Sequence, residues 1–267
     1  MCDFWSAEIY EEATLLYGNY RFKCRFKSNA ELPTYKGSTF RGVFGRALKQ
    51  VVCALKLQGC PDCLLRSECL YPNVFEPHLT VDCHPKEHKT TKPHPYVIQP
   101  PNDSHTDYLQ DDPFEFNLLL FGSINQNLPY FIYALDRMGY IGIGKKIQGR
   151  RARFQLEEVK SNGVLIYQGG DKKLTKLDPF LNLTLSHFED SNEKIGSITL
   201  KFETPLRLKY KNHLALDLPF HMLVRAMLRR ISSLLHYYDG GEPDIDYTGL
   251  VRRAEAINTT GSNLAWE

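Results

Sequence analysis

The sequence lacks any long apolar run. Its longest strongly apolar stretch lies around residues 116–121, whereas a membrane-spanning helix needs about 20 consecutive apolar residues. The first residues, MCDFWSAEIYEEATLLYG, lack the basic start and unbroken apolar core of a secretory signal. We therefore expect a cytoplasmic protein with no membrane partner.

A marked excess of charge of either sign is also missing. The formal net charge is +2, from 33 Lys and Arg against 31 Asp and Glu. This balance points to no particular partner, because a polyanion responds to the local field of a protein and not to its total charge. A chain of 267 residues that is 42% hydrophobic can bury one large core or two ordinary ones.

Cysteine is scarce over most of the chain and concentrated in one segment. Seven cysteines, an odd number, fit a reduced compartment better than a disulfide framework. A Cys-x2-Cys pair with further thiols nearby is the ligand pattern of tetrahedral zinc. We therefore expect a structural zinc ion bound by Cys53, Cys60, Cys63 and Cys69.

Other interpretations of this cluster stay open. Four thiols also suit an iron–sulfur cluster, and free cysteines are commonly buried without any ligand. A thioredoxin-like redox role is less consistent with the pattern, because the Cys-x2-Cys pair does not follow a strand in an α/β sequence. One member of the zinc set could be replaced by Cys83, His78, His84 or His88.

Hydrophobic periodicity predicts an alternation of strands and helices up to residue 160. Residues 20–27 alternate aromatic or cysteine side chains with Arg and Lys, which is typical of a half-buried strand. Further strands are expected at residues 96–99, 114–121 and 151–159. An amphipathic helix is expected to end at residue 52, with Ser38 or Thr39 as its cap, and a second to end at Gly139.

This β-α-β-β-α-β order predicts an α+β fold of the ferredoxin-like (RRM-like) sandwich type in residues 1–160, with a Cys-rich insertion at 53–113. Residues 161–194 are expected to form a linker or hairpin. A second ferredoxin-like unit is predicted at 195–267, with a strand at 198–202 and helices at 220–235 and 247–257. It would need roughly 40 further residues to be complete, so we expect a truncated domain.

Basic residues gather on one surface of this predicted sandwich. The first and last strands are neighbours in such a sheet, and their outward side chains share the open face. Lys and Arg neutralise phosphates, so this face and the glycine-rich loop beside it are predicted to bind nucleic acid, with a solvated sheet face as the alternative. The residues are Arg21, Lys23, Arg25, Lys27, Lys145, Lys146, Arg150, Arg151 and Arg153, joined by Lys36 and Arg41 around the first helix.

The helix at 220–235 carries a polar stripe opposite its apolar one, formed by Arg225, Arg229, Ser232 and His236. RNA cleavage by 2′-hydroxyl attack needs a base, an acid and cations for the developing charge. His236, Tyr35 and Lys36 are therefore the candidate catalytic residues, and Arg225 and Arg229 are candidate RNA ligands. A solvated helix face is the alternative interpretation.

The segment LPTYKGSTFRGVFGRAL at 32–48, the cysteine segment up to Glu76, and residues 142–145 and 151–154 resemble CRISPR-associated RAMP proteins. The subgroup is that of endoribonucleases that cut CRISPR repeat RNA. The resemblance implies two ferredoxin-like domains, RNA held in a basic cleft between them, and metal-independent cleavage that leaves a 2′,3′-cyclic phosphate.

Two features depart from that subgroup. The glycine-rich loop near its C-terminus has no counterpart here, and no histidine lies between Tyr35 and Cys53, where several members place a catalytic one. Two alternative functions therefore stand beside the nuclease. One is a non-catalytic RAMP subunit that binds guide RNA together with other CRISPR effector subunits, and the other is a zinc-stabilised protein without an RNA role.

Overall fold

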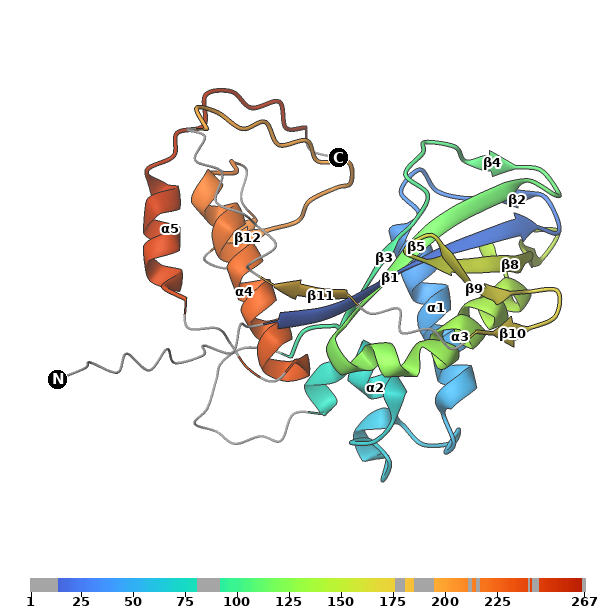
Figure 1. The fold of residues 1–267 in the computed structure, drawn as a ribbon. Helices are drawn as coiled ribbons and strands as arrows, with labels where there is room; N and C mark the ends of the chain where they lie inside the picture. The colour runs from blue at the N-terminus through green and yellow to red at the C-terminus, as the bar shows by residue number, and fades with distance from the viewer. Residues whose placement is uncertain are drawn as a thin grey trace.

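The computed structural model describes residues 14–80, 92–175, 181–184, 195–210, 213–214, 217–239, 241 and 245–265. These residues form a mixed α+β fold built on one large antiparallel sheet (Figure 1). The sheet contains β1 (Thr14–Phe26), β3 (Tyr96–Gln99), β5 (Pro113–Phe121), β8 (Phe154–Ser161), β9 (Val164–Gln168), β10 (Lys173–Leu174) and β11 (Leu181–Thr184). Its order is β10-β9-β8-β1-β5-β3, and β11 pairs with the first residues of β1.

Three short strand pairs lie outside this sheet, namely β2 (Ala30–Glu31) with β4 (Asp107–Tyr108), β6 (Ile143–Ile147) with β7 (Arg150–Ala152), and β12 (Lys209–Tyr210) with β13 (His213–Leu214). The α-helices are α1 (Gly37–Val52), α2 (Leu70–Phe75), α3 (Leu128–Ile141), α4 (Phe220–Tyr238) and α5 (Tyr247–Glu255). The 3-10 turns are η1 (Cys60–Asp62), η2 (Pro77–Leu79) and η3 (Gly122–Asn127). In the described part of the chain, no helix is both long and apolar enough to cross a membrane.

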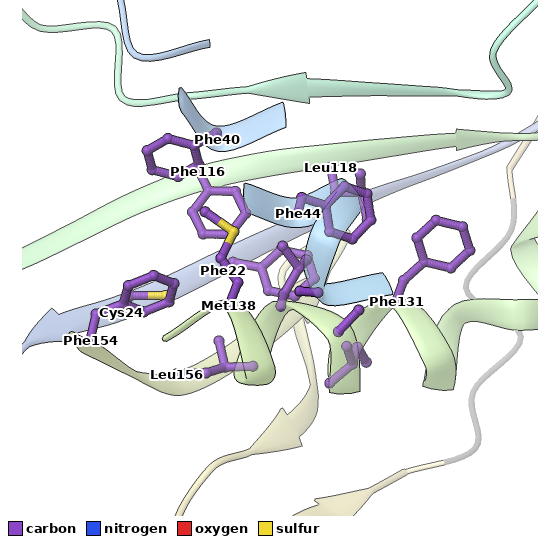
Figure 2. Close-up of a cluster of buried hydrophobic side chains, with 14 of the residues drawn as sticks. Phe22, Cys24, Phe40, Phe44, Phe116, Leu118, Phe131, Met138, Phe154 and Leu156 are labelled. Atoms are coloured by element: carbon purple, nitrogen blue, oxygen red, sulfur yellow. The ribbon is translucent and has the colours of Figure 1, made fainter. Parts of the chain in front are cut away.

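The main core lies between the sheet and helices α1 and α3 (Figure 2). The inward side chains of β1 are fully buried, as their alternation predicts. Phe22 stacks on Phe116 of β5 with ring centroids 5.1 Å apart, and Phe40 of α1 meets the same ring edge-on at 5.2 Å. Burial of each such side chain stabilises the fold by about 1.5–3 kcal/mol, so these aromatics fix how α1 sits on the sheet.

Helix α1 confirms the predicted helix and its end at residue 52, but it begins at Gly37 and its cap differs. The residue before the first turn is Lys36, and neither Ser38 nor Thr39 caps the helix, because both lie inside it. Helix α3 runs past the predicted end at Gly139 to Ile141, and Gly142 terminates it with φ +80°. Gly139 is needed for packing, since a Cβ there would overlap the carbonyl oxygen of Phe154.

The predicted strand at 151–159 is divided in the structure. Its first residues belong to the β6–β7 hairpin, and only β8 joins the large sheet. The alternation of burial is nevertheless as predicted, with Ala152, Phe154 and Leu156 buried and Arg153 and Gln155 exposed. Within the predicted linker, β9, β10 and β11 extend the sheet.

Residues 198–202 form no strand, and their apolar side chains are exposed, so this prediction is wrong. Alternation alone cannot create a strand without a partner edge to pair with. Helices α4 and α5 confirm the two predicted helices, but only part of the apolar stripe of α4 is covered. Leu234 and Leu235 are buried, whereas Met227 and Ile231 are exposed.

The last turns of α4 attach it to the sheet (Figure 1). Leu234 and Leu235 pack with Leu15 of β1 in a second, smaller core. The Tyr238 hydroxyl donates to the carbonyl oxygen of Pro93 at 2.7 Å. One side of helix α4 therefore packs against the main sheet, and another side packs against α5.

Candidate nucleic-acid interface

The open face of the sheet carries matched charges. Arg21 pairs with Glu115 of β5, and the Lys23 ammonium lies 3.2 Å from a carboxylate oxygen of Glu158 on β8. Arg25 forms the third pair, with Glu157 on β8. The basic side chains that β1 places on this face are thus paired with glutamates of the neighbouring strands. A role for Arg21, Lys23 and Arg25 in RNA binding stays a prediction, and it requires each ion pair to be exchanged for a phosphate.

The sequence pattern did not reveal this matching because the acidic residues lie on other strands. In the sequence, Glu115 lies within the mostly apolar strand β5. Glu157 and Glu158 come after the basic residues at the start of the last predicted strand. Strand register alone brings them opposite β1, with Lys23 facing both Glu115 and Glu158. The local charge of a sheet face is thus a property of the pairing and cannot be read from one strand.

Unpaired cations gather instead around the β6–β7 hairpin. Lys145 is held by Glu31 at 2.8 Å, and the Arg151 guanidinium donates to the Gly144 carbonyl. The other three basic residues of this region are exposed, and within the described residues no carboxylate lies within ion-pair distance of them. We call these three, Lys146, Arg150 and Arg153, the hairpin cations.

Lys27 lies next to the hairpin cations. Its backbone N–H donates to the carbonyl oxygen of Arg153 at 2.8 Å, and its side chain is exposed. This backbone contact places Lys27 beside Arg153. Lys27 and the hairpin cations therefore form a cluster of exposed basic residues at this end of the described sheet.

Lys36 is withdrawn from solvent, against the prediction that it contacts RNA or acts in catalysis. Its side chain has 0% relative exposure. The ammonium donates to the carbonyl oxygen of Asp103 at 2.7 Å and lies 3.0 Å from the Asp103 carboxylate. A buried ammonium needs such partners, so the lysine closes the turn before α1. Tyr35 is exposed and remains accessible.

The contact with Lys36 lowers the pKa of Asp103. Burial acts to raise the pKa of Asp103, but hydrogen bonds and the positive charge of Lys36 outweigh it and hold the pKa below its ordinary range. The backbone N–H of His105 and the hydroxyl of Tyr108 also donate to the carboxylate, at 3.0 and 3.2 Å. The carboxylate is therefore ionised near neutral pH.

His94 lies between two guanidinium groups that come from different elements. Its Nδ1 is 2.8 Å from the carbonyl oxygen of Val74 and so carries the proton. Its Nε2 is 3.0 Å from the guanidinium of Arg41, which can only donate, so Nε2 is the acceptor. Arg230 of α4 donates to the backbone carbonyl of His94 at 2.6 Å. His94 is thus a neutral imidazole at the contact between α1 and α4.

The surroundings of His94 favour this neutral form. Burial is the largest cause that lowers the pKa of His94, the hydrogen bond to Val74 raises it, and the positive charges of Arg41 and Arg230 lower it again. Neither His94 nor Arg230 was singled out by the sequence. His94 lies in a proline-rich segment without periodicity, so no sequence signal could have separated it from the other histidines.

A cavity of about 450 Å³ lies between α4 and α5, which pack side by side (Figure 1). Three members of the predicted polar stripe, Arg225, Arg229 and Ser232, line it. Helix α5 adds a third guanidinium from Arg252. The remaining polar lining is Tyr247, Thr248 and Glu255. We call this cavity the α4–α5 pocket.

The pocket brings together residues that the sequence could connect only in part. The i, i+4, i+7 spacing predicts that the three α4 residues share one face, and they do. Arg252 was not predicted to belong to this site, because it lies on a different helix and only the packing of α5 against α4 brings it to the same cavity. His236 is exposed in the last turn of α4 and contacts the Tyr237 ring, and it is not part of the pocket lining.

The four clustered cysteines line one small cavity between α1 and α2. All four are free thiols of intermediate exposure. Among the residues that the structure describes, no three His, Cys, Asp or Glu side chains are already grouped as a metal site. The predicted zinc ligation is therefore untested. The alternative ligands Cys83, His84 and His88 lie outside the described residues.

Comparison with known proteins gives one family and several more distant similarities. The model of a family described as AF_1859_N, N-terminal domain, matches residues 15–179. An uncharacterized protein of Archaeoglobus fulgidus is 24% identical over 213 residues, which are 79% of this chain and 66% of that protein. The RNA-directed RNA polymerase L of human respiratory syncytial virus A is 23% identical over 154 residues, 43% of this chain and 7% of the polymerase.

The chain thus spans less than two thirds of the length of each of these relatives. Among solved structures, a Csm3-Csm4 subcomplex of the type III-A CRISPR-Cas interference complex is similar, with a TM-score of 0.35 and 15% identity. That match covers 56% of this chain and 79% of the other.

Proposed function

We propose that this chain, which belongs to the AF_1859_N family, is an RNA-binding protein of the CRISPR-associated RAMP type, because its segments at 32–48, 142–145 and 151–154 resemble such proteins. The finer part of the proposal is that it cuts CRISPR repeat RNA by 2′-hydroxyl attack without a metal ion. The partner would be CRISPR repeat or guide RNA, with other CRISPR effector subunits as further partners.

The arrangement of the first unit supports the ferredoxin-like part of this proposal. The elements β1, α1, β3, β5, α3 and β8 follow one another along the chain, apart from short inserted turns and strands. Their four strands lie in the order β8-β1-β5-β3, so the first strand neighbours the last. This is the order that a β-α-β-β-α-β sandwich requires when its helices cover one face. The sequence segments that resemble RAMP proteins lie in this unit.

The observation that carries the RNA-binding proposal is the α4–α5 pocket. Arg225, Arg229 and Arg252 present three guanidinium groups to one cavity, and among the described lining residues Glu255 alone adds a carboxylate. Guanidinium groups bind phosphate through paired N–H donors, and Ser232 and Thr248 add hydroxyls that can contact ribose or phosphate oxygens. A volume of about 450 Å³ suits part of an RNA backbone.

The hairpin cations supply a second phosphate-binding surface. Lys146, Arg150 and Arg153 are exposed; the first two come from the two strands of the hairpin, and Arg153 directly follows its second strand. Except for Tyr17 and Phe121, the aromatics of β1 and β5 are buried. The Tyr17–Phe121 pair, on the other face of the sheet, is only partly exposed, with Phe121 packed against the second, smaller core. The described sheet therefore has no freely exposed aromatic pair at its centre of the kind on which an RRM sheet stacks bases. Contact with the RNA backbone is therefore the expected mode of binding.

Cleavage would proceed by internal attack. The 2′-oxygen attacks the adjacent phosphorus and loses its proton to a base, while the bond to the 5′-oxygen breaks and that oxygen takes a proton from an acid. The products are a 2′,3′-cyclic phosphate and a 5′-hydroxyl. His236, which follows Ser232 by one helical turn, is the proposed acid or base.

The non-catalytic alternative is favoured by two observations. Lys36 is buried in its contact with Asp103, and the residues found to line the α4–α5 pocket include no histidine. A RAMP subunit that only binds guide RNA needs the pocket cations but no acid or base.

The test uses the full chain and RNA from a CRISPR repeat array of the same genome, in EDTA, over a series of salt concentrations. Arg252→Gln should weaken binding and lower the slope of log affinity against log salt by about 0.7, the value for one lost phosphate contact on a single strand. Arg253→Gln is the matched control, because Arg253 is exposed on the same helix but does not line the pocket.

The outcomes separate the hypotheses. A discrete cut in EDTA supports the nuclease, while binding without a cut supports the guide-RNA subunit. Cleavage by His236→Ala at the parent rate excludes His236 as the acid or base. Absent or salt-independent RNA affinity contradicts both RNA functions, because phosphate contacts must weaken with salt.

A further inference from the structure

The segment between α1 and α2 is organised around its cysteines. Cys53 follows the last residue of α1, Cys60 begins η1, and Cys69 precedes α2. Together with Cys63 they line one cavity of about 20 Å³. A cavity of that size holds a single water or ion, since one water needs about 10–15 Å³ on this measure.

Residues 53–69 have no apolar core of their own. Every residue of this stretch is exposed except the four cysteines, which are partly buried. Leu57 and Leu64, which could have formed a core, are 102% and 88% exposed. A short segment without buried apolar side chains needs another source of stability, and in small modules this is commonly a metal ion or a disulfide.

Backbone hydrogen bonds hold the thiols around the cavity. The Cys63 amide donates to the Cys60 carbonyl at 3.3 Å, which closes the Cys-x2-Cys turn. The Cys69 amide donates to the Leu65 carbonyl at 2.9 Å, and the Cys53 amide to the Lys49 carbonyl at 3.0 Å. The four ligand positions are thus set by local turns and by the end of α1, and not by long flexible loops.

The surroundings suit an anionic metal centre. A divalent ion with four thiolates has a net charge of −2, which needs nearby cations when it is partly buried. Arg66 lines the cavity, and its guanidinium is fixed by a 2.8 Å bond to the Pro61 carbonyl. Lys49 reaches the same region, with its ammonium 5.0 Å from the ring centroid of Tyr71, another lining residue.

We propose that Cys53, Cys60, Cys63 and Cys69 bind one zinc ion in this cavity. Four soft thiolates in a closed set are the ligands of structural zinc. A single ion fits a cavity of about 20 Å³, whereas the several iron and sulfide atoms of an iron–sulfur cluster would need a larger rearrangement of the four thiols. The ion joins the end of α1 to the start of α2, and binding it requires the thiols to turn toward the centre of the cavity. This site is independent of the RNA proposal.

The test begins with the full chain, purified under reducing conditions, and measures zinc and iron per chain by mass spectrometry. We expect one zinc and no iron. After replacement of zinc by cobalt, the visible spectrum should show the charge-transfer and d–d bands of a tetrahedral tetrathiolate site. Removal of the metal should lower the melting temperature, since binding free energy contributes to folding.

The variant Cys60→Ser/Cys63→Ser should lose zinc to a chelator concentration that leaves the parent loaded. Gln58→Ala is the matched control, because Gln58 lines the same cavity without a ligand atom of this kind, and it should keep its zinc. The cobalt spectrum of the parent decides the question if the double variant does not fold. A parent chain without zinc, cobalt bands of octahedral type, iron with sulfide, or full zinc retention in the double variant would each overturn the proposal.

Discussion

At the scale of single residues, burial changes what a charged side chain can do. Lys36 stands in a glycine-containing turn that suggests an exposed phosphate ligand, yet its ammonium is enclosed by Asp103 and by the Thr34 carbonyl. The same chain leaves Arg153 exposed. Which lysine or arginine is available to a polyanion depends on the surrounding elements, because an unpaired ammonium cannot be buried without a large free-energy cost.

Replacing Asp103 should lower the free energy of unfolding more than replacing Lys36 does. Asp103→Asn leaves a fully buried ammonium without its counter-charge and should lower the free energy of unfolding by about 2 kcal/mol. Lys36→Met leaves a carboxylate that is 53% exposed and can be hydrated, so its cost should stay below about 1 kcal/mol. Urea unfolding at neutral pH measures both, and the reverse order would contradict the argument.

The pair should also make stability depend on acid pH. Because the pKa of Asp103 is depressed in the folded protein, its contribution is present above the unfolded aspartate pKa of about 4 and is lost as pH falls through the folded pKa. The difference in unfolding free energy between the parent and Lys36→Met should therefore shrink in this acid range. A difference that stays constant down to pH ~2 would show that the pair is not ionic.

The pKa of His94 is also lowered in the folded protein. We expect nitrogen-resolved NMR at neutral pH to show the proton on Nδ1, and the titration midpoint to lie below the usual value of about 6.5. Arg41→Leu removes a positive charge and should raise that midpoint, although burial continues to lower it. The neutral His94 stabilises the fold above pH ~6.5, and this stabilisation is lost as pH falls toward the folded pKa. A midpoint unchanged by Arg41→Leu would remove Arg41 as a cause.

At the scale of elements, the placement of α4 rests on a few close contacts. Gly122 has φ +63°, and a Cβ there would overlap the backbone carbonyl of Tyr238 at the end of α4. Glycine is required at this point for two reasons, its positive φ and the approach of the helix. Leu234 and Leu235 then complete the contact with β1.

Gly122→Ala should loosen α4 without unfolding the main sheet. Hydrogen exchange should become faster in α4 and stay slow in β1 and β5, because only the second, smaller core is disturbed. Gly163→Ala is the matched control, since Gly163 has φ +81° but open space around its Cβ position. It should show the cost of the backbone angle alone, about 1 kcal/mol. Equal effects of both variants on α4 would contradict the role of the Tyr238 contact.

At the scale of the whole molecule, positive charge is distributed unevenly although the total is only +2. The open sheet face is neutralised by its own glutamates, as in the Lys23–Glu158 pair. Two groups of three exposed basic residues lie at the hairpin and in the α4–α5 pocket. A polyanion would meet these two regions first, because local field determines association.

Neutralising the hairpin cations together, by Lys146→Gln, Arg150→Gln and Arg153→Gln, should lower the salt slope of RNA affinity by about 2, since each phosphate contact contributes about 0.7. The control removes a matched pair, Arg21→Gln with Glu115→Gln, and should leave the slope unchanged because it leaves the net charge unchanged. Filter binding over a salt series measures both. If the control lowers the salt slope more than the triple variant does, the RNA contacts the open sheet face and not the hairpin.

Much of the fold could be predicted because the periodic signals are strong where one face is buried. Alternating aromatics in β1 and the apolar spacing in α1 each predict an element and its inward face, and both are confirmed. The strand predicted at 198–202 failed because alternation describes a side-chain pattern but supplies no pairing edge. The candidate site was predicted only along α4, where helical spacing places Arg225 and Arg229 together.

By itself, the sequence determined the local periods, the inward faces of β1 and α1, and the spacing of the four cysteines, because these depend on neighbours within a few residues. Only the tertiary structure decided that Lys36 is buried, that the charges of β1 are matched by β5 and β8, and that Arg252 lines the same pocket as Arg229. These depend on strand register and helix packing between residues far apart in the chain. No local pattern records which side chain another element will cover.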